Sequence, residues 1–266
     1  MSTAIEVKDV KRKFGDFVAV NGISFSVEEG TIFAFLGPNG AGKTTTIKMM
    51  TTVLAPTEGR LLISGYNVAT DKMQVRRSLG IVFQDPSLDD ELTAAENMEL
   101  HGVLYRVPRD RRRARTQTLL RFVGLWGRRT EPVKRFSGGM KRRLEVARAL
   151  LHRPRILFMD EPTLGLDPQT RNQIWVLVRE LCKCEQVTVF FTTHYMEEAE
   201  RAADRVAVID HGRIVAQGTV EELREQIGGN SLEEAFIILT GRSIRETDAG
   251  PIDNMRTMRQ VWGGRR

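Results

Sequence analysis

Apolar and polar residues alternate in short blocks along the first third of the chain, and this pattern predicts strands. Blocks rich in β-branched and aromatic residues occupy positions 5–10, 23–27, 31–36 and 60–64. Glycines beside these blocks indicate turns at Gly22, Gly30 and Gly59. A helical spacing of apolar residues follows at 44–54. The first third therefore combines short strands with a helix.

Helical periodicity dominates the middle of the chain, from Leu92 to about Leu151. Thr93 and Glu96 have the spacing of a capping box, in which a Thr hydroxyl and a Glu carboxylate each satisfy a free amide at a helix start. This pair predicts a helix that begins there. We interpret the stretch of about residues 88–151 as a helical insert.

Short and almost continuous apolar runs return at 156–159 and 187–192, as in parallel strands that are buried on both faces. Two further runs, at 206–210 and 213–217, flank a His-Gly dipeptide that fits a tight hairpin. We therefore expect an α/β fold with a mostly parallel sheet. Residues 242–266 are polar and carry several arginines, which predicts a loosely ordered tail.

The composition is that of a globular protein with an excess of basic residues. Of the 266 residues, 41% are hydrophobic and 28% are charged, which excludes a wholly disordered or fibrous chain. Lys and Arg number 40 against 34 Asp and Glu, so the formal net charge is +6. This excess suits an anionic ligand, an anionic membrane surface or nucleic acid, and it favours none of the three.

The hydropathy pattern contains neither a membrane span nor a secretory signal. No apolar run approaches the roughly 18–20 residues that cross a bilayer, and residues 1–9 lack the basic-then-apolar layout of a signal peptide. We therefore expect a cytosolic chain that cannot form a pore by itself. Cys182 and Cys184 stand two apart in a predicted helix, where a disulfide or a zinc site is disfavoured and free thiols are expected.

The densest run of charge lies at residues 106–115 and consists mostly of arginine. A solvated helix face is the favoured interpretation. Nucleic-acid binding is disfavoured, because only Tyr105 supplies an aromatic neighbour and no known nucleic-acid motif surrounds the run. A contact with anionic lipid head groups or with loops of a membrane partner stays open.

A glycine-rich loop stands between a predicted strand and a predicted helix, and it follows the pattern G-x-x-x-x-G-K-[ST]. Its residues are Gly37, Pro38, Asn39, Gly40, Ala41, Gly42, Lys43 and Thr44. Glycines allow backbone amides to surround a phosphate, and the helix start adds free N–H groups. Lys43 can reach the β- and γ-phosphates, while the Thr44 hydroxyl can ligate Mg²⁺. The loop predicts a nucleoside triphosphate site, with a plain glycine-rich turn as the alternative.

Two carboxylates, Asp160 and Glu161, follow directly after the apolar run at 156–159. Ligands bind at the carboxyl ends of strands in open parallel sheets, so Asp160 is placed to hold Mg²⁺ through water. Glu161 is then the candidate general base. We expect an unpaired carboxylate beside a dry strand end to have a raised pKa, which favours taking a proton from water. An ordinary pair of charges at a helix N-terminus is the alternative.

A second anion site is predicted at Ser137-Gly138-Gly139, where a long helical run begins. Free amides at a helix start bind anions. Taken alone, the same residues are equally typical of a simple helix cap. The phosphate loop earlier in the chain favours the anion site.

In their order and spacing, these motifs resemble the nucleotide-binding domain of an ATP-binding cassette (ABC) transporter. The matching positions are residues 37–44, Gln84, Ser137-Gly138-Gly139, Asp160-Glu161, Asp167 and His194. The resemblance covers about residues 4–241, with 242–266 as the tail. It implies a P-loop NTPase core with a mostly parallel sheet, an antiparallel β subdomain and the helical insert.

The resemblance also implies roles for single residues. Phe14 would stack on adenine, where the family usually has Tyr, and Thr45 would belong to the nucleotide-binding residues. Gln84 is similar to the glutamine that touches Mg²⁺ and the attacking water and links the nucleotide to the membrane partner. His194 is similar to the histidine that contacts the γ-phosphate and steadies the base. Read alone, Phe14, Gln84 and His194 each have a purely structural alternative.

A dimer is a further implication of the resemblance. In the family two cassettes pack head to tail, so each ATP lies between the phosphate loop of one chain and the Ser-Gly-Gly helix of the other. The segment that ends at Asp167 resembles the turn that crosses from one cassette to the other. This chain has one copy of each motif, so a second copy or a close relative is needed. Met140 stands where the family more usually has Gln after Ser-Gly-Gly. This difference changes the side chain and leaves the backbone amides in place.

The function implied is an ATP-hydrolysing subunit that works as a homodimer on the inner face of the cell membrane and drives a separate permease. The segments at 231–236 and 240–242 resemble a helix near the C-terminus of drug, lipid or polysaccharide exporters, which favours export of a drug-like or lipid-linked substrate, with antibiotic resistance as one form of it. The alternative is a soluble ABC ATPase that acts on nucleic acid or in cofactor assembly. A non-hydrolysing sensor would lack the base, and Glu161 is present.

Overall fold

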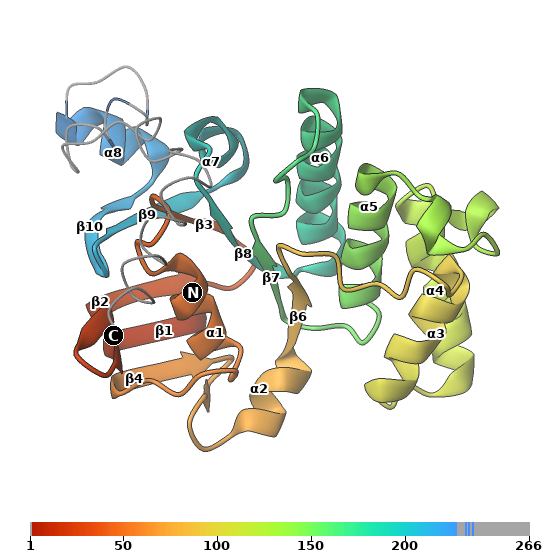
Figure 1. Ribbon diagram of the computed structural model, residues 1–266, viewed down its shortest axis with the longest axis horizontal. Coiled ribbons are helices and arrows are strands. Elements are labelled where there is room, and N and C mark those ends of the chain that lie inside the picture. The colour runs from red at the N-terminus through yellow and green to blue at the C-terminus, as the bar shows by residue number, and fades with distance from the viewer. Residues whose placement is uncertain (1, 228–231, 233, 235, 237–266) are drawn as a thin grey trace, which may run out of the picture.

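The residues that the structure describes form two β-sheets and several helices (Figure 1). The computed structural model describes residues 2–227 together with residues 232, 234 and 236. The predicted tail, 242–266, and most of the segment 231–242 lie outside the described residues. Within the described part, every helix is too short or too polar to span a lipid bilayer.

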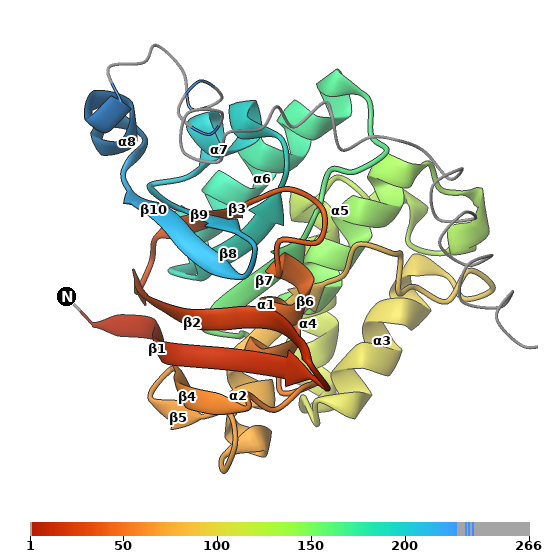
Figure 2. The same ribbon diagram turned by 60° about the vertical axis from the view of Figure 1, so that its left-hand side comes forward.

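The smaller sheet is antiparallel and lies at the front in Figure 2. Among the described residues its order is β2-β1-β4-β5, with β1 at Thr3–Phe14, β2 at Phe17–Glu28, β4 at Glu58–Ile63 and β5 at Tyr66–Asn67. The strands predicted at 5–10, 23–27 and 60–64 are confirmed, and the first two are longer than predicted. The predicted turn at Gly30, between β2 and the next strand, is also confirmed.

The predicted turns at Gly22 and Gly59 are wrong. Gly22 lies inside β2 and Gly59 inside β4, with φ of 71° and 89°. The pairing register with β1 shifts beside each of them, so the positive φ belongs to a β-bulge and not to a turn. A Cβ at position 59 would also lie 2.4 Å from the carbonyl oxygen of Asp9. Glycine marks both kinds of irregularity, and strand pairing decides between them.

The larger sheet has the order β10-β9-β3-β8-β7-β6 among the described residues. Its strands are β3 (Ile32–Leu36), β6 (Leu79–Val82), β7 (Ile156–Asp160), β8 (Thr188–Thr193), β9 (Arg205–Asp210) and β10 (Arg213–Gly218). Neighbours from β9 to β6 pair in parallel, and β9 and β10 form the predicted hairpin. Every residue of β3, β7 and β8 is buried, which the apolar runs at 156–159 and 187–192 predicted for β7 and β8. The α/β fold class is confirmed.

Helices flank the larger sheet, and α3 and α4 lie farthest from the antiparallel sheet (Figure 1). The α-helices are α1 (Lys43–Met50), α2 (Lys72–Ser78), α3 (Ala94–Leu104), α4 (Arg109–Phe122), α5 (Gly138–Ala149), α6 (Pro168–Glu185), α7 (Met196–Ala202) and α8 (Val220–Ile227). α1 ends four residues earlier than predicted, because Thr52 adopts a left-handed φ of 64°. The predicted capping box opens α3, where Glu96 accepts from the Thr93 amide at 2.8 Å.

Hydrophobic layers cover both faces of the larger sheet. On the face towards the antiparallel sheet, the ring centroid of Phe25 lies 5.6 Å from that of Phe33 and 6.1 Å from that of Phe190. On the opposite face, Trp175 of α6 lies 4.4 Å from Phe191 of β8 between ring centroids. This double burial fixes the central strands, whose carboxyl ends meet at one edge of the sheet.

The basic run at 106–115 is partly paired. Arg112 Nε donates to Glu99 at 2.7 Å and joins α4 to α3, while Arg115 donates to both carboxylate oxygens of Glu185 at 2.7 Å and joins α4 to α6. The other arginines in the first half of α4 are exposed. The run is therefore a solvated face only in part, because its paired arginines connect helices.

The two cysteines lie in α6, as predicted. Cys182 is buried, Cys184 is exposed, and both thiols are free. Burial raises the pKa of the Cys182 thiol to about 12. This thiol is therefore protonated at neutral pH.

Candidate functional site

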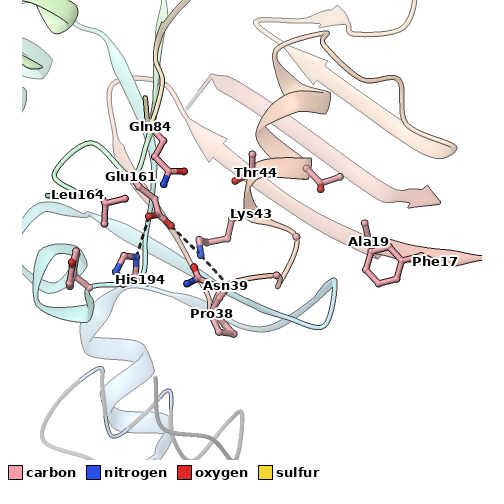
Figure 3. Close-up of a pocket in the computed structure, with 14 residues that line it drawn as sticks. Phe17, Ala19, Pro38, Asn39, Lys43, Thr44, Gln84, Glu161, Leu164 and His194 are labelled. Carbon is pink, nitrogen blue, oxygen red and sulfur yellow. Dashed lines mark hydrogen bonds and ion pairs between the residues drawn. The ribbon is translucent and has the colours of Figure 1, made fainter. Parts of the chain in front are cut away.

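The predicted phosphate loop joins the end of β3 to the start of α1, beside a cavity of about 610 Å³ (Figure 3). Gly42 is the N-cap of α1 and has a φ of 108°. A Cβ there would lie 2.7 Å from the carbonyl oxygen of Ala19, so packing against β2 and backbone conformation both require glycine. The cavity is lined by Phe17, Ala19, Pro38, Asn39, Gly40, Gly42, Lys43, Thr44, Thr45, Gln84, Glu161, Leu164, His194 and Tyr195.

Lys43 brings a buried ammonium to this cavity. The residue is 5% exposed, and its Nζ donates to the carbonyl oxygens of Gly37 at 2.7 Å and Pro38 at 3.1 Å. Glu161 Oε1 lies 3.5 Å from the same nitrogen. Burial lowers the pKa of Lys43, and the Glu161 carboxylate opposes that shift. Loop carbonyls are neutral acceptors, so a phosphate oxygen would be a stronger partner for this cation.

Thr192 holds the Asp160 carboxylate and the Glu161 main chain at the end of β7. Its hydroxyl donates to Asp160 Oδ1 at 2.6 Å and accepts from the backbone N–H of Glu161 at 3.0 Å. Burial raises the pKa of Asp160, and the hydrogen bond from Thr192 opposes the shift. The sequence analysis missed Thr192, because its role follows from the β7–β8 register, in which Thr192 pairs with Asp160.

Glu161 is not the unpaired carboxylate that we expected. His194 Nδ1 lies 3.3 Å from its Oε2, and Lys43 Nζ lies 3.5 Å from its Oε1. The His194 ring and then Lys43 hold the pKa of Glu161 below its ordinary value, against the effect of burial. The expected rise in this pKa is therefore wrong, because the fold brings two partners from distant segments. Glu161 is ionised at neutral pH and remains a proton acceptor.

A buried carboxylate lies behind the Glu161–His194 pair and holds both segments. Glu198 accepts from the Thr163 hydroxyl at 2.5 Å and from the Thr193 hydroxyl at 3.1 Å. Thr163 follows Glu161 by two residues, and Thr193 directly precedes His194. This support matters because Glu161 has a φ of 45°, a backbone conformation that is costly for a residue other than glycine. Sequence reasoning missed Glu198, since α7 contains other glutamates and only packing shows which one is buried.

Most of the predicted nucleotide residues come together at the cavity. Figure 3 shows Lys43 and Thr44 between Phe17 on one side and Glu161 on the other. The predicted residues in the lining are Pro38, Asn39, Gly40, Gly42, Lys43, Thr44, Thr45, Gln84, Glu161 and His194. Gly37, Ala41 and Asp160 are buried next to them. The lining residues that sequence reasoning missed are Phe17, Ala19, Leu164 and Tyr195, which belong to no motif.

Phe14, the predicted adenine platform, is not among the lining residues. Its ring is 44% exposed, and the Arg12 guanidinium lies 4.5 Å from the ring centroid. Phe17 pairs with Phe14 across the β1–β2 turn, lines the cavity and is 65% exposed. Two accessible aromatic rings therefore stand at this end of the hairpin, and either could stack on a base.

The second predicted anion site lies elsewhere on the chain. Ser137 is the N-cap of α5, and its Oγ accepts from the Met140 amide at 3.3 Å. Asp167 is the N-cap of α6, and its Oδ1 accepts from the Thr170 amide at 3.0 Å. The two helix starts are in contact, since a Cβ at Gly139 would lie 2.5 Å from Thr170 Cγ2. Neither helix start lines the phosphate-loop cavity of its own chain.

Oxygen donors beside the loop fit a magnesium ion. Thr44 supplies a hydroxyl, Gln84 an amide oxygen and Asp160 a carboxylate at the end of β7. Mg²⁺ prefers such ligands and keeps several waters, so it requires few protein groups. Among the residues that the structure describes, no group of three or more His, Cys, Asp or Glu is placed to hold a metal ion.

The chain matches one family model and several known ATP-binding proteins. A sequence model of the family described as ABC transporter matches residues 20–164. The chain is 42% identical to the daunorubicin resistance ATP-binding protein DrrA3 of Streptomyces coeruleorubidus, over 87% of this chain and 73% of that protein. It is 38% identical to the linearmycin resistance ATP-binding protein LnrL of Bacillus subtilis (88% and 78%). It is 42% identical to the Nod factor export ATP-binding protein I of Ralstonia nicotianae (86% and 71%).

Solved structures agree with the sequence relatives. One, described as the ATP binding subunit of an ABC transporter, has a TM-score of 0.81 and 33% identity, over 90% of this chain and 100% of that chain. Another is a dimeric, post-hydrolysis state of an ATP-binding cassette bound to ADP and Pi. It has a TM-score of 0.72 and 28% identity, over 81% of this chain and 98% of that chain.

Neutralising the two adjacent carboxylates should change stability in opposite directions. Asp160→Asn is expected to raise the free energy of unfolding at pH 7 by about 1 kcal/mol, because burial disfavours the charge and the amide oxygen can still accept from Thr192. Glu161→Gln is expected to lower it by about 1 kcal/mol, because the pairs with Lys43 and His194 weaken.

Urea unfolding without nucleotide measures both values. The contribution of Glu161 in the wild type is present above the ordinary carboxyl pKa and is lost as pH falls through its lowered pKa. The difference between Glu161→Gln and the wild type should therefore shrink in acid. Stability changes of the same sign for Asp160→Asn and Glu161→Gln at pH 7 would contradict the two opposite pKa shifts.

Proposed function

Because this chain belongs to the ABC transporter family as an ATP-binding subunit, we propose that its cavity holds ATP with Mg²⁺ and that Glu161 is the general base of hydrolysis. The chain is thus an ATPase, and the proposal assigns residues to that activity. The observation that carries it is the convergence of Lys43, Glu161 and His194, from distant parts of the chain, on one cavity.

The phosphate loop binds the triphosphate in this proposal. Lys43 turns from the loop carbonyls to the β- and γ-phosphates, and the first amides of α1 add free donors at the positive end of the helix dipole. Thr44, Gln84 and Asp160 are the residues that would hold Mg²⁺. Mg²⁺ held there would neutralise part of the charge of the phosphates.

Glu161 takes the proton of the attacking water. In the free chain His194 and Lys43 hold its pKa below the ordinary value, against the effect of burial. Once Lys43 turns to phosphate, Glu161 loses part of this stabilisation, so its pKa rises and it becomes a better proton acceptor. His194, supported from behind by Glu198, keeps the carboxylate in place.

A homodimer completes the ATP site. The helix starts at Ser137 and Asp167 do not line the cavity of their own chain, so a second copy is the natural source of the second set of amides. The dimeric cassette bound to ADP and Pi supports this arrangement by similarity. ATP would then join the two chains, and hydrolysis would release them.

Export of a drug-like or lipid-linked molecule through a separate permease is the transport function that we propose. The names of the relatives refer to daunorubicin resistance, linearmycin resistance and Nod factor export. The described part of this chain contains no helix that could itself cross the membrane. In this proposal the chain works at the inner face of the membrane, bound to the permease.

Glu161→Gln is expected to bind ATP, to hydrolyse it at least about 100-fold more slowly, and to accumulate as a dimer. The amide keeps the volume of the side chain and loses the proton acceptor. The matched control is Lys43→Ala, which should abolish ATP binding and stay monomeric. Size-exclusion chromatography with Mg-ATP and a nucleotide-binding assay measure both variants. A purely monomeric Glu161→Gln, or normal ATP affinity in Lys43→Ala, would refute the proposed site.

Phe14 is proposed to carry the adenine, as the resemblance implies, and Phe17 offers a direct comparison. Phe14→Ala is expected to weaken ATP affinity about tenfold, because a stacking contact of about 1 kcal/mol and its buried area are lost. Phe17→Ala should change the affinity less than about twofold. Equilibrium binding of ATP measures both. The reverse order of effects would assign the platform to Phe17.

Membrane association should depend on the permease. We expect the chain to copurify with membranes only when a separate permease is coexpressed, because the described helices provide no span. Membrane flotation of cells with and without the permease measures this, and Lys43→Ala serves as a control that leaves the docking surface unchanged. Equal membrane retention without the permease would contradict the proposal.

A further inference from the structure

One side of α5 holds the loop that carries Gln84. Arg142, Glu145 and Arg148 are spaced three residues apart, so their side chains lie close together along the helix. They contact residues 83–87, which directly follow β6 and which we call the Gln84 loop. None of the three side chains lines the phosphate-loop cavity.

Arg142 holds the main chain on both sides of the Gln84 Cα. Its Nη1 donates to the carbonyl oxygen of Phe83 at 2.6 Å, and its Nη2 donates to the carbonyl oxygen of Gln84 at 2.9 Å. A planar guanidinium thus fixes two consecutive peptide groups. The point from which the Gln84 side chain extends is therefore set relative to α5.

Glu145 and Arg148 hold the far end of the loop at Ser87. Glu145 Oε1 accepts from the Ser87 backbone N–H at 2.8 Å and from its hydroxyl at 3.3 Å. Arg148 Nη1 donates to the Ser87 carbonyl oxygen at 2.6 Å, and Nη2 bonds to the same hydroxyl. The backbone N–H, the carbonyl oxygen and the hydroxyl of Ser87 are therefore all hydrogen-bonded to side chains of α5.

Burial makes these contacts mutually dependent. Arg142 is 5% and Glu145 is 1% exposed, and Arg142 Nη1 lies 3.0 Å from Glu145 Oε2. Burial lowers the pKa of Arg142 and raises that of Glu145, so each charge relies on the other and on the loop. A buried ion pair adds little net stability by itself. Here both partners direct further hydrogen bonds at the loop main chain, which indicates that the pair fixes the loop.

We propose that Arg142, Glu145 and Arg148 are positioning residues that make the Gln84 loop and α5 one rigid unit. α5 begins after Ser137, and about 7.5 Å of helix separates that start from Arg142. The unit therefore joins Gln84, at one ATP site, to the helix start that would bind the ATP of the second copy. A shift of that helix start moves Gln84 relative to its own phosphate loop. The inference rests on the roles proposed above for Gln84 and Ser137.

The test is a double-mutant cycle between Arg142→Gln and Gln84→Ala, with Arg143→Gln as the matched control. Arg143 is the next residue of α5, but it donates to the carbonyl oxygen of Val123 at 3.0 Å, away from the Gln84 loop. The purified full-length chain is assayed for ATP hydrolysis. The quantities measured are kcat, the KM for ATP and the Mg²⁺ concentration that gives half-maximal rate.

Arg142→Gln is expected to lower kcat about tenfold and to raise the Mg²⁺ requirement, with the KM for ATP changed less than about twofold. The phosphate loop is untouched, so ATP binding should persist. In the Gln84→Ala background the same substitution should have no further effect, because it acts through Gln84. Glu145→Gln should reproduce this pattern and serves as the second variant if Arg142→Gln does not fold. Arg143→Gln should keep all three quantities within about twofold of the wild type.

Equal fold losses from Arg142→Gln in the wild-type and Gln84→Ala backgrounds would overturn the inference, since the helix would then act independently of Gln84. Normal kcat in Arg142→Gln and Glu145→Gln, with Gln84→Ala impaired, would also overturn it. So would an equal loss in Arg143→Gln. A wild-type chain without ATPase activity, or a fully active Gln84→Ala, would instead refute the proposed function and the inference with it.

Discussion

The buried ammonium of Lys43 is the group on which the rest of the site depends. A cation removed from water is costly unless acceptors surround it, and this chain supplies loop carbonyls on one side and Glu161 on the other. A phosphate oxygen would be a stronger partner than the neutral loop carbonyls, so in the proposed site Lys43 exchanges these internal contacts for the ligand. The same exchange acts on Glu161, because the His194 ring and Lys43 hold its pKa below the ordinary value in the free chain.

This balance of charge requires three segments to meet within a few ångströms, and the larger sheet brings them together. The loop after β3, the carboxylates that end β7 and the histidine after β8 emerge from neighbouring parallel strands at the same edge. Stacked phenylalanine rings on one face and helices on the other bury these strands completely. The pairing of Asp160 with Thr192 then provides the hydroxyl that binds the Asp160 carboxylate and the backbone N–H of Glu161.

The helix starts at Ser137 and Asp167 are placed differently, because they touch each other and do not reach the cavity of their own chain. In the proposed homodimer, the second chain supplies the set of amides that the cavity of one chain lacks. The contacts between α5 and the Gln84 loop add a mechanical connection to this arrangement. In this proposal, a shift of α5 at one bound nucleotide would also move Gln84, which lies beside the other nucleotide.

Patterns among neighbouring residues were sufficient to predict the local features of the chain. The phosphate loop, the capping box at Thr93, the buried strands and the helix caps all depend on residues within a few positions of one another. Contacts between distant segments decided the strand irregularities and the charge environment of the site. Glycine marked an irregular backbone at positions 22 and 59, but strand pairing made each a bulge. The sequence predicted Glu161 as the candidate general base and expected a raised pKa. Its pKa is lowered by Lys43 and His194, which lie 118 and 33 residues away along the chain (161 − 43 and 194 − 161). Charge and hydrogen bonding act through space, and spacing along a chain does not encode which groups the fold will bring within reach.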